Sequence, residues 1–171
     1  MPSDKPTPYA NNHSVGAAKG GAQTDGFVRD PTVRRFLASP MNEGIELHDS
    51  ELSAVSFSDG SAVVSLSPAY LHRSSGVPGS DAGSGWSQPA TLTFAGTSPV
   101  SLPAKLPAWV SDGLLRIGDT VHKNLIPASG CFEGAVEFSI VLVTAETLTI
   151  RGQRVTIQLH GEPSYIEDFN P

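Results

Sequence analysis

Apolar and polar residues alternate over most of the chain, which is the pattern of half-buried β-strands. Around Asp59-Gly60 this pattern predicts a hairpin in which Phe57 faces Ala62 and Val55 faces Val64. An Asp-Gly pair is a favoured two-residue turn, and the register that the turn imposes agrees with the apolar positions.

A second hairpin is predicted further along the chain, with Gly152-Gln153 as its turn. Glycine in the first loop position suits a type II′ turn. The register would set Arg151 opposite Arg154, a mildly unfavourable like-charge pair, and Ile150 opposite Val155. The apolar face expected to be buried consists of Ile150, Val155 and Ile157.

Further strands are expected between and beyond these hairpins, at residues 91–95, 114–117, 121–125, 133–143 and 165–169. Strand 133–143 is apolar on both faces at its end, through Val141 and Val143, which predicts a central and covered position. About eight to ten strands are therefore expected. The predicted fold class is all-β, an antiparallel β-sandwich or β-barrel with one short N-terminal helix over residues 30–39.

The N-terminal part of the chain differs in composition. Residues 1–29 are rich in small and polar residues and are expected to form a flexible tail. Asp30 can cap a helix and Pro31 suits the first helical position, which predicts the helix over residues 30–39; an irregular segment packed on the body is the alternative. Residues 30–171 are then expected to form a single β domain.

Charge and length restrict the possible partners. The chain has 171 residues, which fits one domain, and residues 41–171 hold fourteen acidic and only six basic side chains. Nucleic-acid binders need clustered Lys and Arg, so no nucleic-acid partner is expected. An acidic body suits a basic protein partner, or serves solubility alone.

The sequence lacks the apolar segments that would indicate a membrane-spanning or a secreted protein. No apolar stretch approaches roughly 20 residues, so no membrane partner is expected. Residues 1–20 contain no segment typical of a secretory signal, and we expect a cytoplasmic protein.

Two irregular stretches are candidate binding loops. Residues 73–89 are rich in glycine and serine and are expected to form a long loop, and residues 96–112 form a second one. Each stretch contains one tryptophan, a residue type that is enriched among interface anchors. The alternative is that each stretch folds back over an open end of the fold. The candidate binding residues are Trp86, Asp81, Arg73 and Trp109.

Catalytic motifs are missing from the sequence. It contains no phosphate-binding loop and no G-x-S-x-G nucleophile motif. Cys131 is expected to be a structural cysteine near the core. Glu133 and Glu137 would lie roughly 13 Å apart along a strand, too far for a glycosidase pair. No catalytic residue and no cofactor are therefore predicted.

Histidines are the remaining candidates for metal chemistry, although none forms an H-x-H or H-E-x-x-H motif and no metal site is predicted outright. The most suggestive local pair is His48-Asp49, because a carboxylate can orient an imidazole. The alternative is that His48 ends a strand and Asp49 begins a turn. The candidate ligands are His48, Asp49, His72, His122 and His160.

Three segments carry a resemblance to known proteins: residues 47–52 (L-H-D-S-E-L), 67–73 (S-P-A-Y-L-H-R) and 161–169 (G-E-P-S-Y-I-E-D-F). Over residues 45–169 the chain resembles a family of small uncharacterised proteobacterial proteins, and more loosely the immunity proteins of polymorphic toxin systems, several of which start with an H-D pair before a strand. The family has no assigned activity, so the resemblance implies no functional residue.

Three classes of function remain open. The first is a non-enzymatic protein-binding or inhibitor module of the immunity type, favoured by the acidic body and the missing catalytic motifs. The second is a structural or assembly component. The third, least favoured, is a metal-dependent enzyme that uses strand histidines.

Overall fold

The computed structural model describes residues 42–98 and 101–170, and all regular structure in them is β. The predicted tail (1–29) and helix (30–39) lie outside these residues. The all-β prediction is confirmed for the described part. Its strands are β1 (Asn42–Glu46), β2 (Glu51–Ser58), β3 (Ser61–Ser74), β4 (Gly83–Ala95), β5 (Ala108–Ile117), β6 (Thr120–Lys123), β7 (Leu125–Pro127), β8 (Gly130–Leu142), β9 (Thr147–Leu159) and β10 (Ser164–Phe169).

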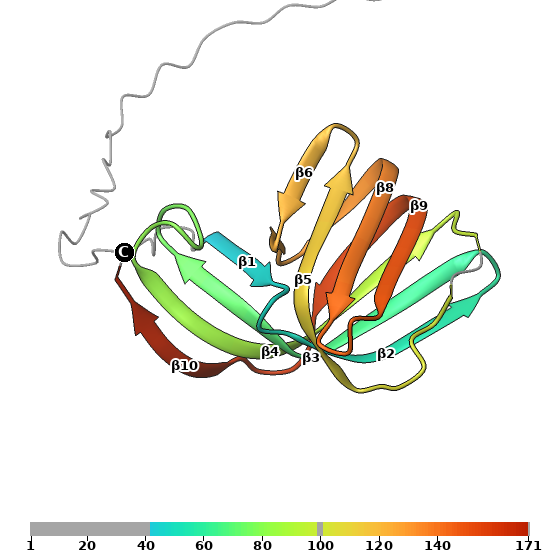
Figure 1. Ribbon diagram of the computed structural model, residues 1–171. Helices are drawn as coiled ribbons and strands as arrows, with labels where there is room; N and C mark the ends of the chain where they lie inside the picture. Colours follow the sequence, from blue (N-terminus) through green and yellow to red (C-terminus); the bar gives the residue numbers. More distant parts are fainter. Residues whose placement is uncertain (1–41, 99–100, 171) are drawn as a thin grey trace, which may run out of the picture. The chain divides into compact units, whose positions relative to one another are not determined.

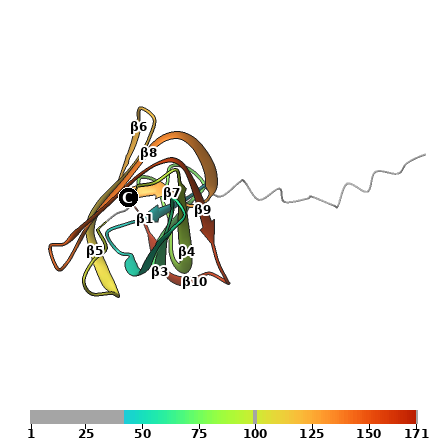
Figure 2. The same ribbon diagram turned by 90° about the vertical axis from the view of Figure 1, so that its right-hand side faces the viewer.

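Six of these strands form a closed antiparallel barrel in the order β2-β3-β4-β9-β8-β5. The ring closes where β5 pairs back to β2, with Trp109 opposite Glu51 and Ala108 opposite Leu52. Figure 1 shows these strands from the side, and Figure 2 shows them turned by 90°. Of the two predicted architectures, the described residues therefore adopt the barrel.

The barrel interior is filled by the inward-facing residues of the alternating strands. Phe94 of β4 and Phe138 of β8 are fully buried, with ring centroids 5.6 Å apart. The predicted burial of Ile150, Val155 and Ile157 is confirmed, since none is more than 1% exposed. Close packing of these apolar side chains stabilises the barrel.

One part of the sheet, which we call the wing, extends beyond the barrel from two of its strands. Pro68 has no amide hydrogen, and the register between β3 and β4 shifts there, between Leu66 and Ala69. Beyond this shift, residues 69–74 of β3 and 83–88 of β4 leave the barrel. There β3 pairs with β1 and β4 pairs with β10, while β7 pairs with β1. The wing order is β10-β4-β3-β1-β7. Figure 1 labels β10, β4, β3 and β1, and Figure 2 labels β7.

The turn at Asp59-Gly60 is confirmed together with its register, because Phe57 lies opposite Ala62 and Val55 opposite Val64. Asp59 and Gly60 have φ values of 50° and 71°, the left-handed conformation that a type I′ turn requires. β5 and β6 are joined by a second two-residue connection at Gly118-Asp119, with Ile117 opposite Thr120.

The predicted Gly152-Gln153 hairpin is wrong. β9 runs through these residues as one strand, and Gly152 lies opposite Val136 of β8. A Cβ atom on Gly152 would lie 2.8 Å from the carbonyl oxygen of Ala95, so the glycine serves a close approach of backbones and not a turn.

The predicted pair of like charges across that hairpin is therefore absent as well. Arg151 donates to the carboxylate of Glu137 at 3.0 Å, and Arg154 lies 3.4 Å from that of Glu133. Each arginine faces a glutamate of β8, which is the favourable arrangement across antiparallel strands.

β8 has the predicted central position, between β5 and β9, but two other predictions about it are wrong. The face of β8 that carries Val141 is not covered: Val141 is 37% exposed, and Val143, just beyond the strand, is 63% exposed. Cys131, expected near the core, is exposed. Its side chain points outward because Phe132, the next residue, packs against the core.

The prediction of a long loop over residues 73–89 is wrong as well. β3 extends through Ser74 and β4 begins at Gly83, which leaves only residues 75–82 as the connection. The glycine and serine content suggested a loop. Gly83 and Gly85 instead occupy strand positions where a Cβ atom would collide, with the Arg73 carbonyl at Gly83 and with the Tyr70 hydroxyl at Gly85.

Candidate functional site

The structure places three of the four predicted binding residues on the wing. The Arg73 guanidinium lies over the ring of Trp86, 4.7 Å from its centroid, and Tyr165 of β10 packs edge-on against the same ring at 5.4 Å. Asp81 lies in the β3–β4 turn, where its carboxylate accepts from the Val77 amide at 2.6 Å. Trp86 is thus a half-buried strand residue and not a loop anchor.

The fourth predicted binding residue, Trp109, is not part of this group. It lies on β5 of the barrel, opposite Glu51, and is 46% exposed. The two tryptophans therefore do not form one surface.

Two of the candidate histidines meet at the junction of β1 and β2, whereas the other two lie elsewhere. His48 and His72 both lie beside Glu46, the last residue of β1. His160 hydrogen-bonds Thr91 at 2.7 Å, and His122 lies on β6 opposite Leu115.

Glu46 is the residue that sequence analysis missed. One carboxylate oxygen contacts Nε2 of His72, and the other accepts from the Asn124 side-chain amide at 3.1 Å. Asn124 is 78 positions from Glu46 in the chain, so no local pattern could have indicated this contact.

The turn that follows Glu46 is held by a network of hydrogen bonds. Asn124 accepts from the His48 amide through its side-chain oxygen at 2.8 Å and from the Leu47 amide through its carbonyl at 2.7 Å. The fully buried Ser50 donates to the Glu46 carbonyl at 2.5 Å and accepts from the Tyr70 amide at 3.0 Å. The side chains at the tip of the turn are therefore carried on a fixed backbone.

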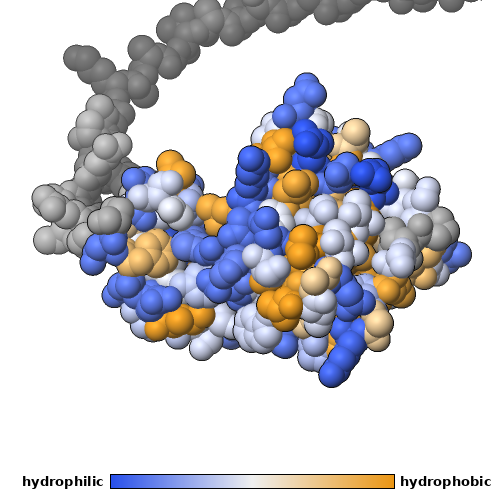
Figure 3. All heavy atoms as spheres, viewed as in Figure 1, coloured by the Kyte–Doolittle hydropathy of each residue, from blue (hydrophilic) through white to orange (hydrophobic). Residues whose placement is uncertain are grey.

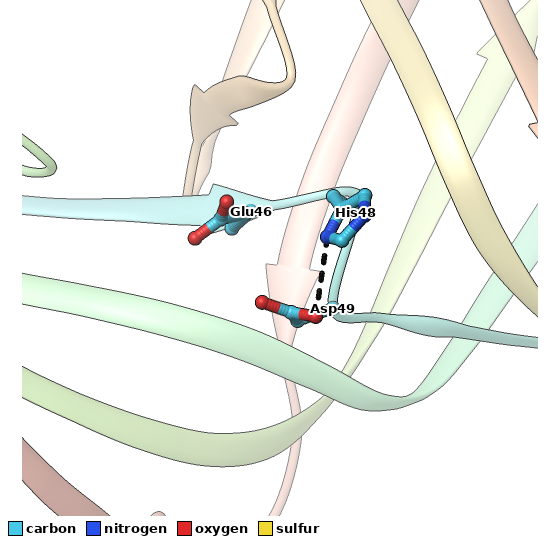
Figure 4. Close-up of side chains that lie close together, drawn as sticks. All are labelled: Glu46, His48 and Asp49. Carbon is cyan, nitrogen blue, oxygen red and sulfur yellow. Dashed lines mark ion pairs between the residues drawn. The ribbon is translucent and has the colours of Figure 1, made fainter.

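Those side chains form a compact group of possible ligands. Nδ1 of His48 lies 3.2 Å from a carboxylate oxygen of Asp49, and one ligand atom from each of Glu46, His48 and Asp49 lies within 4.8 Å of the others. Figure 4 shows the three side chains around the end of β1. His48 and Asp49 are 56% and 57% exposed, so the group is open to solvent on one side.

His72 is enclosed by aromatic rings on the outer face of the wing. Its ring lies 5.3 Å from that of Tyr70 and 4.8 Å from that of Phe169, measured between centroids. Tyr70 donates to the Glu167 carboxylate at 2.8 Å. Burial, together with this hydrogen bond, raises the pKa of Tyr70 well above its usual range, so the phenol stays neutral.

An open hollow of about 570 Å³ lies where β8 and β9 shift register, away from Glu46 and its neighbours. It is lined largely by glycine backbone, at Gly96, Gly134 and Gly152, and by the ion pair of Glu133 with Arg154. None of the predicted site residues lines it. Its charged groups are already paired with each other, so it offers little to recognise a ligand.

Comparison with known proteins gives no relative: neither a protein-family model, nor a curated protein, nor a solved structure matches the chain. Among the described residues no helix is long and apolar enough to cross a membrane. The interpretation of the site therefore depends on its own geometry.

Proposed function

We propose that the chain is a non-enzymatic protein-binding module that binds a basic partner protein through the wing. The observation that carries this proposal is the exposure of two apolar side chains on the edge strand β10. Tyr165 is 52% exposed and Ile166 is 45% exposed, and they are followed directly by Glu167 and Asp168. Apolar contacts surrounded by acidic groups are suited to a partner with a basic rim.

The distribution of charge supports a positively charged partner. Residues 42–98 and 101–170 hold fourteen acidic and six basic side chains. Three of the six, Arg73, Arg151 and Arg154, already form ion pairs with glutamates. Most acidic groups of the described part therefore have no Lys or Arg partner, and the resulting field accelerates encounter with a basic protein.

The arrangement under β10 supports a preformed surface. Tyr165 rests on Trp86, which in turn lies under the Arg73 guanidinium, and Arg73 is held by Glu43 at 2.7 Å. A ring supported in this way loses little conformational entropy on binding. Figure 3 shows hydrophobic residues flanked by hydrophilic ones along the part of the wing that β10 forms. An inhibitor of the immunity-protein type is one form that such a module takes.

Site-specific photo-crosslinking in the source cell tests the proposal. A photoreactive residue is placed at Ile166, with a matched control at Val143, which is 63% exposed but lies at the end of β8. We expect one defined adduct with a basic protein from position 166, weakened by salt and lost in Tyr165→Ala. No adduct at 166, or the same adduct from position 143, would overturn the proposal.

A further inference from the structure

We propose that Glu46, His48 and Asp49 bind a divalent transition-metal ion of the Zn²⁺ type. These side chains supply one imidazole nitrogen and two carboxylate oxygens, and their ligand atoms lie within 4.8 Å of one another. Ligands at roughly 2.0–2.2 Å from a Zn²⁺ ion lie about 3–4 Å apart, so small side-chain rotations complete the coordination. The imidazole favours such an ion over Mg²⁺ or Ca²⁺, which prefer oxygen ligands throughout.

The contacts around Glu46 have the form of an outer coordination shell. The His72 imidazole and the Asn124 amide each hold one oxygen of its carboxylate, which fixes the direction of the remaining lone pairs. His72 is mostly buried, with 14% of its side chain exposed, and lies between Tyr70 and Phe169. It acts as a positioning residue for the ligand and does not itself bind the ion.

The second argument comes from Asn124, which lies between β6 and β7 and holds the turn that follows Glu46. Asn124 adopts a left-handed φ of 56°, an uncommon conformation for a residue other than glycine, and from there holds both the His48 amide and the Glu46 carboxylate. The side chains at the tip, His48 and Asp49, contact each other and are more than half exposed. A rigid support under two exposed ligand side chains is the preorganisation that a metal site requires.

Charge at the site favours a cation as well. Within the described ranges, the Lys and Arg ion pairs of the chain go to Glu43, Glu133 and Glu137, and neither Glu46 nor Asp49 has such a partner. A divalent ion would neutralise these two carboxylates. It would also replace the contact between His48 and Asp49 with two bonds to the metal. The three side chains leave a fourth position open for water.

Titration calorimetry with ZnCl₂ on the full, untagged chain, after removal of bound metal with a chelator, tests this site. We expect one Zn²⁺ ion per chain at the site, with binding weakened by roughly tenfold or more in His48→Ala and in Asp49→Asn. The matched control is His160→Ala, because His160 hydrogen-bonds Thr91 away from the site and its loss should leave the affinity unchanged. Circular dichroism checks that each variant is folded.

The positioning role of His72 has its own readout. Co²⁺ takes the place of Zn²⁺ and reports its ligand geometry through its visible absorption. We expect His72→Gln, which keeps a hydrogen-bond donor, to retain a Co²⁺ spectrum close to that of the unmodified chain, and His72→Leu to alter it. Zn²⁺ binding that survives in His48→Ala, or that is lost equally in His160→Ala, would overturn the proposed site.

Discussion

Gly85 illustrates how a single residue determines which side chains can pack on the outer face of the wing. Gly85 lies within β4 in an extended conformation. Because it has no side chain, the Tyr70 ring can cross β4 and reach Glu167 on β10. A Cβ atom on Gly85 would lie 2.1 Å from the Tyr70 hydroxyl oxygen. The glycine content that suggested a loop in the sequence instead permits this packing.

Gly85→Ala is therefore expected to destabilise the fold by about 1–3 kcal/mol, the usual cost of inserting a methyl group where there is no room. Urea denaturation measures the change. In a Tyr70→Ala background the same substitution should cost clearly less, because the atom that it strikes is gone. An equal cost in both backgrounds would contradict the packing described for Tyr70.

Tyr70 also predicts a dependence of stability on alkaline pH. Its folded-state pKa is raised above the ordinary value of 10.0 by burial and by Glu167. The unfolded chain therefore loses this proton at a lower pH than the folded chain does. The contribution of Tyr70 is complete below pH 10 and declines as the pH rises above that value. Denaturation at a series of pH values should show a shallower alkaline decline in Tyr70→Phe than in the unmodified chain.

The buried face of β9 gives a matched pair of substitutions. Ile157 is 1% exposed and Thr156, its neighbour, points to the opposite face. Ile157→Ala should cost about 2–5 kcal/mol through loss of burial and the cavity that remains. Thr156→Ala should cost about 0.5 kcal/mol or less. Similar costs for the two variants would show that the assignment of faces in β9 is wrong.

Residue-level prediction from sequence succeeded where alternation alone decides the outcome, as at Ile150 and Val155. It failed at Glu46, whose partners lie 26 and 78 positions away. Contacts of this kind arise from the pairing of β1 with both β3 and β7, which no local pattern encodes. The sequence therefore indicated His48, Asp49 and His72 separately, without the carboxylate that lies beside them all.

At the level of elements, the two hairpin predictions made from glycine-containing pairs show what turn chemistry can and cannot decide. Asp59-Gly60 needs two left-handed residues in succession, and few other structures use that sequence. Gly152 followed by Gln153 is far less specific, because glycine also occurs where two backbones approach closely. Only the pairing of β9 with both β4 and β8 distinguishes the two cases.

The edge strand β10 should be separable from the barrel. It pairs only with the outer part of β4, and Tyr165 is its contact with Trp86. Deleting residues 161–171 in a Trp109→Phe background should shift the Trp86 fluorescence to the red, while circular dichroism keeps the β signal. The matched control carries the same deletion with Trp86→Phe, which leaves Trp109 as the emitter, and should show no shift. A red shift in both proteins would mean that the barrel itself had opened.

At the scale of the whole molecule, the sequence did not reveal whether the strands close into a barrel. Closure depends on two residue pairs between β2 and β5, together with a hydrogen bond from the Val110 amide to the Ser50 carbonyl at 3.0 Å. These segments are more than 50 positions apart in the chain. A sandwich and a barrel present the same alternation, so the prediction left both open.

Closure predicts a gradient of stability across the molecule. The barrel strands have hydrogen-bonded neighbours on both sides, whereas the wing ends in the edge strands β7 and β10. Amide hydrogen exchange should therefore be slowest in β8 and β9 and fastest in β10. Exchange in β10 as slow as in β9 would indicate that another chain or segment covers this edge.

The hairpin of β3 and β4 has a consequence for engineering the protein. Because both strands run without a break from the barrel into the wing, the wing is not a module that can be cut out and grafted onto another scaffold. Any transfer that severs these strands also opens the barrel. A foreign sequence is better inserted in the connection at residues 75–82, where the chain turns back and no strand is interrupted.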